Sequence, residues 1–216
     1  MKYIKKLYAL IPRYAHLPLI LTFVSMMTVY NLPRILNVAP TFDFVLPIDG
    51  KIPLISFFSY IYIIAYVYWA LSYIYISRFS KDFCTRLFTA DLIGKIVSFA
   101  CFMLLPCTFL RPAAEEAAGI GAWLIKVIYT MDEPTNLLPS LHCFVSYLCV
   151  RPLFSKNAPK TNLAMLIVSV VYSALVCLST LFTRQHIFLD LVTGIALGEI
   201  AWMIAKFVPF RKNSKE

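Results

Sequence analysis

Six apolar runs dominate this chain, and each approaches the ~20 residues that a helix needs to cross a bilayer. They are Pro12–Tyr30, Pro53–Ile76, Leu92–Leu110, Leu137–Phe154, Leu163–Phe182 and Ile187–Val208. Of the 216 residues, 60% are hydrophobic and only 14% are charged, which excludes an ordinary soluble domain. We therefore expect an all-α fold, a six-transmembrane-helix bundle that forms one membrane domain over residues 1–216.

Basic residues gather in alternate connections between these runs. The four groups are Lys2, Lys5, Lys6 and Arg13; Arg78, Lys81, Arg86 and Lys95; Arg151, Lys156 and Lys160; and Arg211, Lys212 and Lys215. This alternation predicts that both termini are cytoplasmic. Lys95 is expected to snorkel to the interface. The net charge of +9 therefore indicates anionic lipid headgroups, and not nucleic acid, as the electrostatic partner. We expect an integral protein of the plasma membrane.

Three polar residues fall at the predicted non-cytoplasmic ends of separate runs. Arg111 follows the third run, His142 begins the fourth and His186 begins the sixth. Asp190 lies four residues after His186, so a helix places both side chains on one face. The carboxylate of Asp190 can then hold one ring nitrogen and leave the other as a nucleophile or base. Taken singly, His186 with Asp190 is also typical of a capped helix start, His142 of an incidental interface histidine, and Arg111 of a headgroup anchor.

Phosphoryl chemistry requires a nucleophile, a proton donor for the leaving oxygen, and positive charge around the phosphoryl oxygens. His186, His142 and Arg111 supply these groups in turn. A metal site is the alternative use of a His–x3–Asp pair. The third histidine of the chain, His16, falls on the opposite side, which leaves too few ligands. We expect no metal and no cofactor.

The motifs at these positions resemble those of the type-2 phosphatidic acid phosphatase superfamily. The second family motif appears as Pro139-Ser140-Leu141-His142, with Leu141 where Gly is usual, and the third as Ser179-Thr180-x5-His186-x3-Asp190. Arg111-Pro112 matches the end of the first motif. The match covers about residues 108–190, and the Pro-Ser-Leu-His form is similar to inositol-phosphorylceramide synthase-like proteins. The family's motif lysine is replaced by Leu104, and a motif arginine is replaced by Thr180.

The resemblance implies that His186 attacks phosphorus and forms a phosphohistidine, while Asp190 holds its ring and His142 protonates the leaving oxygen. Arg111, Ser140 and Arg184 are then expected to hold the phosphoryl oxygens. The implied activity is a lipid-phosphate phosphatase whose site faces the non-cytoplasmic side. The two lost cations favour a lipid headgroup phosphotransferase as an alternative, because a phosphodiester carries less charge than a phosphomonoester. A catalytically silent membrane scaffold or transporter is the alternative of another class.

Two further stretches carry open alternatives. Gly121–Tyr129 is expected to form either a short amphipathic helix in the interface over the site or a re-entrant or packing segment. The second run is rich in aromatic residues, which indicate either a groove for an acyl chain or aromatic packing. Its aromatic residues include Tyr60, Tyr62, Tyr66, Tyr68, Trp69, Tyr73 and Tyr75.

Overall fold

A computed structural model describes residues 11–208, and this part of the chain is all-α, with no β-strand. Its seven α-helices are α2 (Arg13–Ile35), α3 (Phe58–Ser77), α4 (Lys81–Leu104), α5 (Ala122–Met131), α6 (Leu141–Val150), α7 (Leu163–Phe182) and α8 (Phe188–Ile204). Short 3-10 turns occur at Asp49–Lys51, Ala114–Glu116 and Arg151–Phe154. Six basic residues from which the orientation of the chain ends was predicted lie outside the described residues. They are Lys2, Lys5, Lys6, Arg211, Lys212 and Lys215.

Four of these helices, α2, α3, α4 and α7, are long and apolar enough to cross a membrane. They correspond to the first, second, third and fifth predicted runs. Within the fourth run, α6 has only 10 residues before the chain tightens into the 3-10 turn at Arg151–Phe154. In the sixth run, α8 has 17 residues. An integral membrane protein is therefore supported by four helices, and the count of six spans and the cytoplasmic termini stay predictions.

The third predicted span begins eleven residues too late, because α4 starts at Lys81. Ser80 caps this helix, and its side chain accepts a hydrogen bond from the backbone N–H of Phe83. The prediction that Lys95 snorkels is wrong. Its side chain is 1% exposed and forms a 2.7 Å ion pair with Asp91 one turn earlier. Because the two opposite charges form an ion pair within the same helix, both side chains can be buried away from water.

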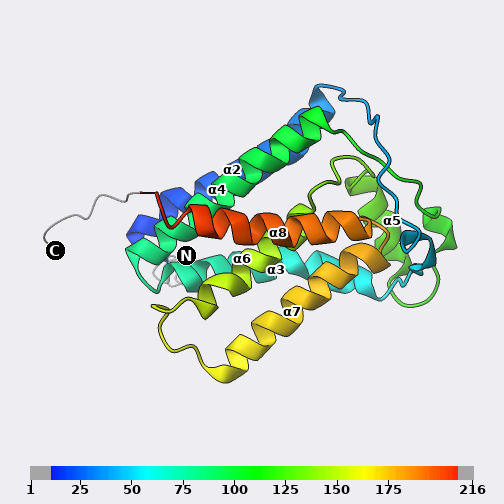
Figure 1. The fold of residues 1–216 in the computed structure, drawn as a ribbon. Coiled ribbons are helices and arrows are strands. Elements are labelled where there is room, and N and C mark those ends of the chain that lie inside the picture. The colour runs from blue at the N-terminus through cyan, green and yellow to red at the C-terminus, as the bar shows by residue number, and fades with distance from the viewer. Residues whose placement is uncertain (1–10, 209–216) are drawn as a thin grey trace, which may run out of the picture.

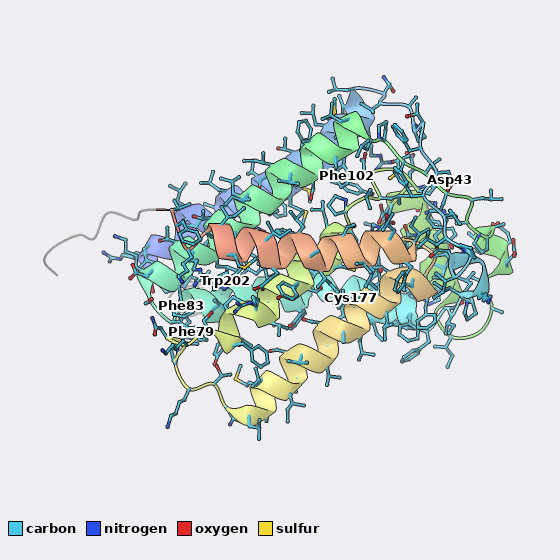
Figure 2. The ribbon with its side chains drawn as sticks, viewed as in Figure 1. Asp43, Phe79, Phe83, Phe102, Cys177 and Trp202 are labelled. Atoms are coloured by element: carbon cyan, nitrogen blue, oxygen red, sulfur yellow. The ribbon has the colours of Figure 1, made fainter. Side chains whose placement is uncertain are left out.

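Helix α6 lies at the centre of the bundle and packs against α7 and α8, with further contacts to α3 and α4. Most of its residues are buried. Helix α2 packs along α4 and makes few contacts with α3, so α2 and α4 form a pair that diverges from the other helices (Figure 1). Side chains project outward from α2 and α7 (Figure 2). The exposed apolar residues of these helices include Leu17, Phe23 and Val168, as expected for faces in contact with lipid.

Helices α2 and α4 begin, and α8 ends, at one end of the bundle, and α5 lies at the opposite end (Figure 1). Helix α8 begins beside α5, where it meets the start of α6. Gly194 allows this contact, because a Cβ at that position would lie 2.5 Å from the backbone oxygen of Ser140. The close approach of α6 and α8 brings the two predicted catalytic histidines to the same end of the molecule.

Candidate functional site

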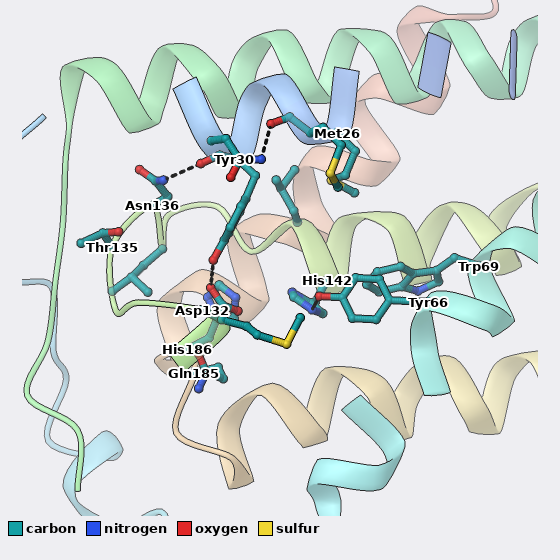
Figure 3. Close-up of a pocket in the computed structure, with 15 residues that line it drawn as sticks. Met26, Tyr30, Tyr66, Trp69, Asp132, Thr135, Asn136, His142, Gln185 and His186 are labelled. Atoms are coloured by element: carbon teal, nitrogen blue, oxygen red, sulfur yellow. Dashed lines mark hydrogen bonds between the residues drawn. The ribbon is translucent and has the colours of Figure 1, made fainter. Parts of the chain in front are cut away.

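A cavity of about 280 Å³ lies at this end of the bundle, and both His142 and His186 line it (Figure 3). Its wall includes Met26, Tyr30 and Asn31 of α2, Tyr66 and Trp69 of α3, and Asp132 and Asn136 from the segment between α5 and α6. The two histidine rings have their centroids 5.9 Å apart. Residues that are 44 positions apart in sequence therefore share one small, largely apolar chamber.

His186 lies in the tight turn that joins α7 to α8. The backbone oxygen of Thr180 accepts hydrogen bonds from the backbone N–H groups of Gln185 and His186, at 3.0 and 3.1 Å. Thr180 occupies the position of the lost motif arginine, and its hydroxyl is buried and donates to the oxygen of Cys177. Thr180 therefore shapes the turn through its backbone oxygen, and its side chain adds no positive charge to the site.

Asp190 both holds the ring of His186 and caps α8. Nδ1 of His186 donates to Oδ2 of Asp190 at 3.2 Å, and the same oxygen accepts from the backbone N–H of Ile187 at 3.0 Å. This bond fixes the tautomer that leaves Nε2 of His186 for chemistry. Oδ1 of Asp190 is buried without a hydrogen-bond partner among residues 11–208. The predicted pairing of His186 with Asp190 is therefore present in the structure, as is the cap.

Burial acts to lower the pKa of His186, but the hydrogen bond and negative charge of Asp190 outweigh it and raise this pKa above its ordinary value of 6.5. The pair thus favours a positive imidazole. The same carboxylate would stabilise the His186 ring if that ring became positive on forming a bond from Nε2 to phosphorus.

His142 is held in an aromatic enclosure at the start of α6. Its ring stacks on Tyr62 at a centroid distance of 4.3 Å and contacts Trp69 at 5.1 Å. The hydroxyl of Tyr66 lies 3.5 Å from Nε2 of His142. This packing fixes the ring against the cavity wall, where it faces the space shared with His186.

Ser140 is the N-cap of α6 and not a wall of the cavity. Its hydroxyl accepts from the backbone N–H of Cys143 at 3.4 Å, and its own backbone N–H donates to the backbone oxygen of Asp190 at 3.1 Å. The side chain is fully buried. Ser140 therefore positions His142 relative to Asp190, while its predicted contact with a phosphoryl group is not part of this arrangement.

The guanidinium group of Arg111 lies behind the cavity. It donates to the backbone oxygens of Tyr129 and Asp132, at 3.0 and 2.8 Å, and to Oε1 of Gln185 at 3.3 Å. It also stacks over the ring of Tyr129 at 3.9 Å. Gln185 lines the cavity, and its Nε2 is buried without a partner within the described part of the chain. Arg111 thus reaches the site through Gln185 and Asp132.

Arg184 points away from the cavity. Its guanidinium donates to the backbone oxygens of Asp49 and Ile52, and it lies 5.7 Å from the ring centroid of Phe109. Asp49 in turn accepts from the backbone N–H of Phe188 at 2.7 Å, which adds a second cap to α8. Arg184 therefore fastens the loop before α3 to the histidine turn, and the structure does not bring it to the site as a phosphate ligand.

Asp132 was not predicted from the sequence, yet it lies at the centre of the site. The hydroxyl of Tyr30 donates to its carboxylate (Figure 3), and so does the hydroxyl of Tyr62. Asp132 therefore joins α2, α3 and the segment after α5. A signal was present in the second run, where Tyr62, Tyr66 and Trp69 recur at helical spacing and mark one face. Nothing in the sequence indicates that Asp132 meets that face, because the contact depends on the path of a long loop.

The segment predicted at Gly121–Tyr129 is a helix, α5, from Ala122 to Met131. Its buried face packs on Tyr62, and the hydroxyl of Tyr129 donates to the backbone oxygen of Thr183 at 3.1 Å. Trp123 and Met131 on the other face are exposed. The helix therefore covers the histidine turn, and its place in a membrane interface stays a prediction.

Comparison of the chain with protein-family models, with curated proteins and with solved structures finds no match. Among residues 11–208, no three or more His, Cys, Asp or Glu side chains are grouped in a way that would hold a metal ion. The resemblance to the phosphatidic acid phosphatase superfamily thus rests on the motif residues alone.

Proposed function

We propose that this protein cleaves a lipid phosphoester at the cavity between His142 and His186, with His186 as the nucleophile. The observation that carries the proposal is the 3.2 Å contact of His186 with Asp190, made in a cavity that a second histidine also lines. A buried carboxylate behind an imidazole, with a proton donor opposite, is the arrangement that nucleophilic histidine chemistry requires.

In the first step, Nε2 of His186 forms a bond to phosphorus and the bond from phosphorus to the ester oxygen breaks. His142 gives its proton to that leaving oxygen, so the lipid departs as an alcohol. In the second step, His142 takes a proton from water, and the water oxygen displaces His186 from phosphorus. Inorganic phosphate is then the second product.

The apolar wall of the cavity favours a lipid over a soluble phosphoester. Met26, Trp69 and Leu137 line the chamber together with the histidines. Their side chains give a soluble sugar or nucleotide few hydrogen-bonding groups. The proposed setting is the plasma membrane, with the site on the non-cytoplasmic face that the loop charges predict.

A headgroup phosphotransferase is the second candidate, and the charges around the cavity favour it. Arg184 points away, Arg111 is engaged by backbone oxygens, and the carboxylate of Asp132 adds negative charge. A phosphomonoester brings nearly two negative charges to this site, whereas a phosphodiester brings one. In this reaction the hydroxyl of a lipid replaces water in the second step.

The two activities separate when the purified protein receives a lipid phosphate with and without a long-chain alcohol. A phosphatase releases phosphate at a rate that the alcohol does not change. A transferase passes the phosphoryl group from His186 to the alcohol, which yields the phosphomonoester of that alcohol, and phosphate release falls. Replacing His186 by Ala is expected to reduce either activity by about 10³-fold or more. Full turnover in that variant would instead support a catalytically silent fold with a contaminating enzyme.

A further inference from the structure

A second cavity, of about 310 Å³, lies between α2 and α3 and continues from the histidine cavity toward the middle of the bundle. The two cavities share four lining residues, Met26, Met27, Tyr66 and Trp69. Away from the histidines, the second cavity is lined by Leu19, Phe23 and Ala70, among others. It exists because α2 packs on α4 and makes few contacts with α3.

The far end of this cavity is formed by a buried polar cluster. Asp91 accepts from Lys95 at 2.7 Å, from the hydroxyl of Thr22 at 2.9 Å and from the hydroxyl of Tyr73 at 2.9 Å. Lys95 also donates to the backbone oxygen of Thr22 at 2.8 Å. Both charged side chains are 1% exposed. Each of the four side chains is hydrogen-bonded within the cluster, so they are held in place.

Ionisable residues inside a membrane bundle are costly and usually serve a function. Helix–helix attachment alone explains a contact between α2 and α4. It does not explain why the cluster lies where an apolar groove ends, with Thr22 and Tyr73 turned to the same carboxylate from α2 and α3. A fixed polar wall is a poor surface for a hydrocarbon chain to pass, because the chain would have to break hydrogen bonds that water cannot replace.

The length of the groove fits one lipid tail. From Asn31 in the first cavity to Thr22 at the polar wall, α2 rises about 14 Å at 1.5 Å per residue. This is a little less than half of the ~30 Å hydrocarbon core of a bilayer, and a tail from one leaflet occupies about half of that core.

We propose that the groove between α2 and α3 binds one hydrocarbon tail of the substrate, and that the Asp91–Lys95 ion pair, with Thr22 and Tyr73, sets the greatest tail length that fits. The inference rests on the proposed function, because it places the phosphate of that lipid between His142 and His186. Beyond the proposed function, it says that residues far from the reacting atoms select the substrate by the length of its tail.

The direct test is photo-crosslinking with alkyl phosphates of increasing chain length that carry a diazirine at the tail end. The His186→Ala variant is used, so binding is measured without turnover. Tails that fit are expected to label Leu19, Thr22 or Tyr73 at the closed end. Label confined to lipid-facing residues such as Leu71 would overturn the proposal. If the groove is labelled but the unsubstituted protein shows no turnover, tail binding in the groove is supported and the proposed activity is rejected.

Two matched substitutions test the role of the groove in turnover. Ala70→Phe places a ring in the groove, and the ratio of kcat/KM for long tails to kcat/KM for short tails is expected to fall by about tenfold or more. Leu71→Phe adds the same ring to the neighbouring residue, which is 62% exposed and does not line the groove. It should leave the ratio unchanged. Equal ratios in both variants would contradict the groove.

The wall itself is tested with two double variants. Asp91→Ala with Lys95→Ala empties the end of the groove and should extend activity to longer tails. Asp91→Asn with Lys95→Gln fills a similar volume and keeps hydrogen-bonding groups, so it should keep the original limit. An unchanged limit in the Ala pair would reject the wall. If the Ala pair does not fold, the crosslinking series decides, because tails longer than the groove must then bind more weakly in the His186→Ala protein.

Discussion

Asp190 uses one carboxylate oxygen both to cap a helix and to orient a histidine ring. Its Oδ2 accepts both the backbone N–H of Ile187 and Nδ1 of His186, so the cap of α8 and the orientation of the imidazole depend on the same atom. A carboxylate that also caps the helix N-terminus is held by two hydrogen bonds. The ring that it holds therefore has little freedom to turn away from the cavity.

Asp190→Asn is expected to keep the cap, since an amide oxygen also accepts from Ile187, but to lose the charge. Without that charge, burial lowers the pKa of His186, because Asp190 is what raises it. The acidic limb of the kcat/KM profile should move to lower pH, and the maximum should fall by about 10²- to 10⁴-fold. Asp190→Ala should also cost about 1 kcal/mol of stability. A profile of Asp190→Asn with an unmoved acidic limb would contradict this role.

The negative charge of Asp132 is expected to make the protein discriminate between substrates that carry different charges. Asp132→Asn removes one negative charge from the cavity, so KM for a lipid phosphomonoester should fall by roughly 3- to 10-fold, and KM for a phosphodiester should fall less. Tyr30→Phe is the matched control, because it removes a hydrogen bond to Asp132 and leaves the charge. If both variants change the two KM values alike, the contacts of Asp132 matter and its charge does not.

At the scale of elements, the site depends on how closely α8 approaches the start of α6. Gly194 lies where these helices meet, and the backbone N–H of Ser140 donates to the backbone oxygen of Asp190 across the same contact. His142 lies in α6 and His186 lies in the turn that leads into α8, so their separation is set here.

Gly194→Ala is expected to force α6 and α8 apart, because the added Cβ would lie 2.5 Å from the oxygen of Ser140 and 3.0 Å from Cβ of Cys143. The cost should be about 1–3 kcal/mol of unfolding free energy, with a loss of kcat. Gly50→Ala is the matched control, because nothing lies within 4 Å of its added Cβ. It should change stability by less than about 0.5 kcal/mol. Denaturant unfolding in detergent compares the two, and equal effects would reject the close contact.

Helical periodicity and hydrophobic length predicted most of the elements, including α7 with the bounds observed, Leu163–Phe182. They failed for α4, because its first half is polar and is stabilised by a cap and by the Asp91–Lys95 pair. His186 with Asp190 was predicted because a four-residue spacing fixes a local contact. The orientations of Arg111, Arg184 and Asp132 were not, because each is set by partners that are distant in sequence.

At the scale of the whole molecule, the histidine cavity is lined by residues near the end of α2 and by the turn before α8. The start of α2 and the end of α8 lie at the opposite end of the bundle (Figure 1). The loop charges predict that this end faces away from the cytoplasm. Glu115, in the loop before α5, and Asn157, in the loop after α6, are exposed at the two ends.

A cysteine at Glu115 should react with a membrane-impermeant thiol reagent on intact cells. A cysteine at Asn157 should react only after the cells are permeabilised. The unsubstituted chain supplies the background, because five of its six cysteines are buried and Cys101 is half-buried. The reverse pattern of labelling would place the site in the cytoplasm and would contradict the predicted orientation.

The central claim is that His186 forms a covalent bond to phosphorus. The most direct measurement is to mix the purified protein with a lipid phosphate labelled with radioactive phosphorus, to denature it in alkali within the first turnover, and to map the label by mass spectrometry. We predict acid-labile phosphate on the peptide that contains His186, and none in the His186→Ala variant. Label on His142 instead, or turnover by His186→Ala at the rate of the unsubstituted protein, would contradict the mechanism.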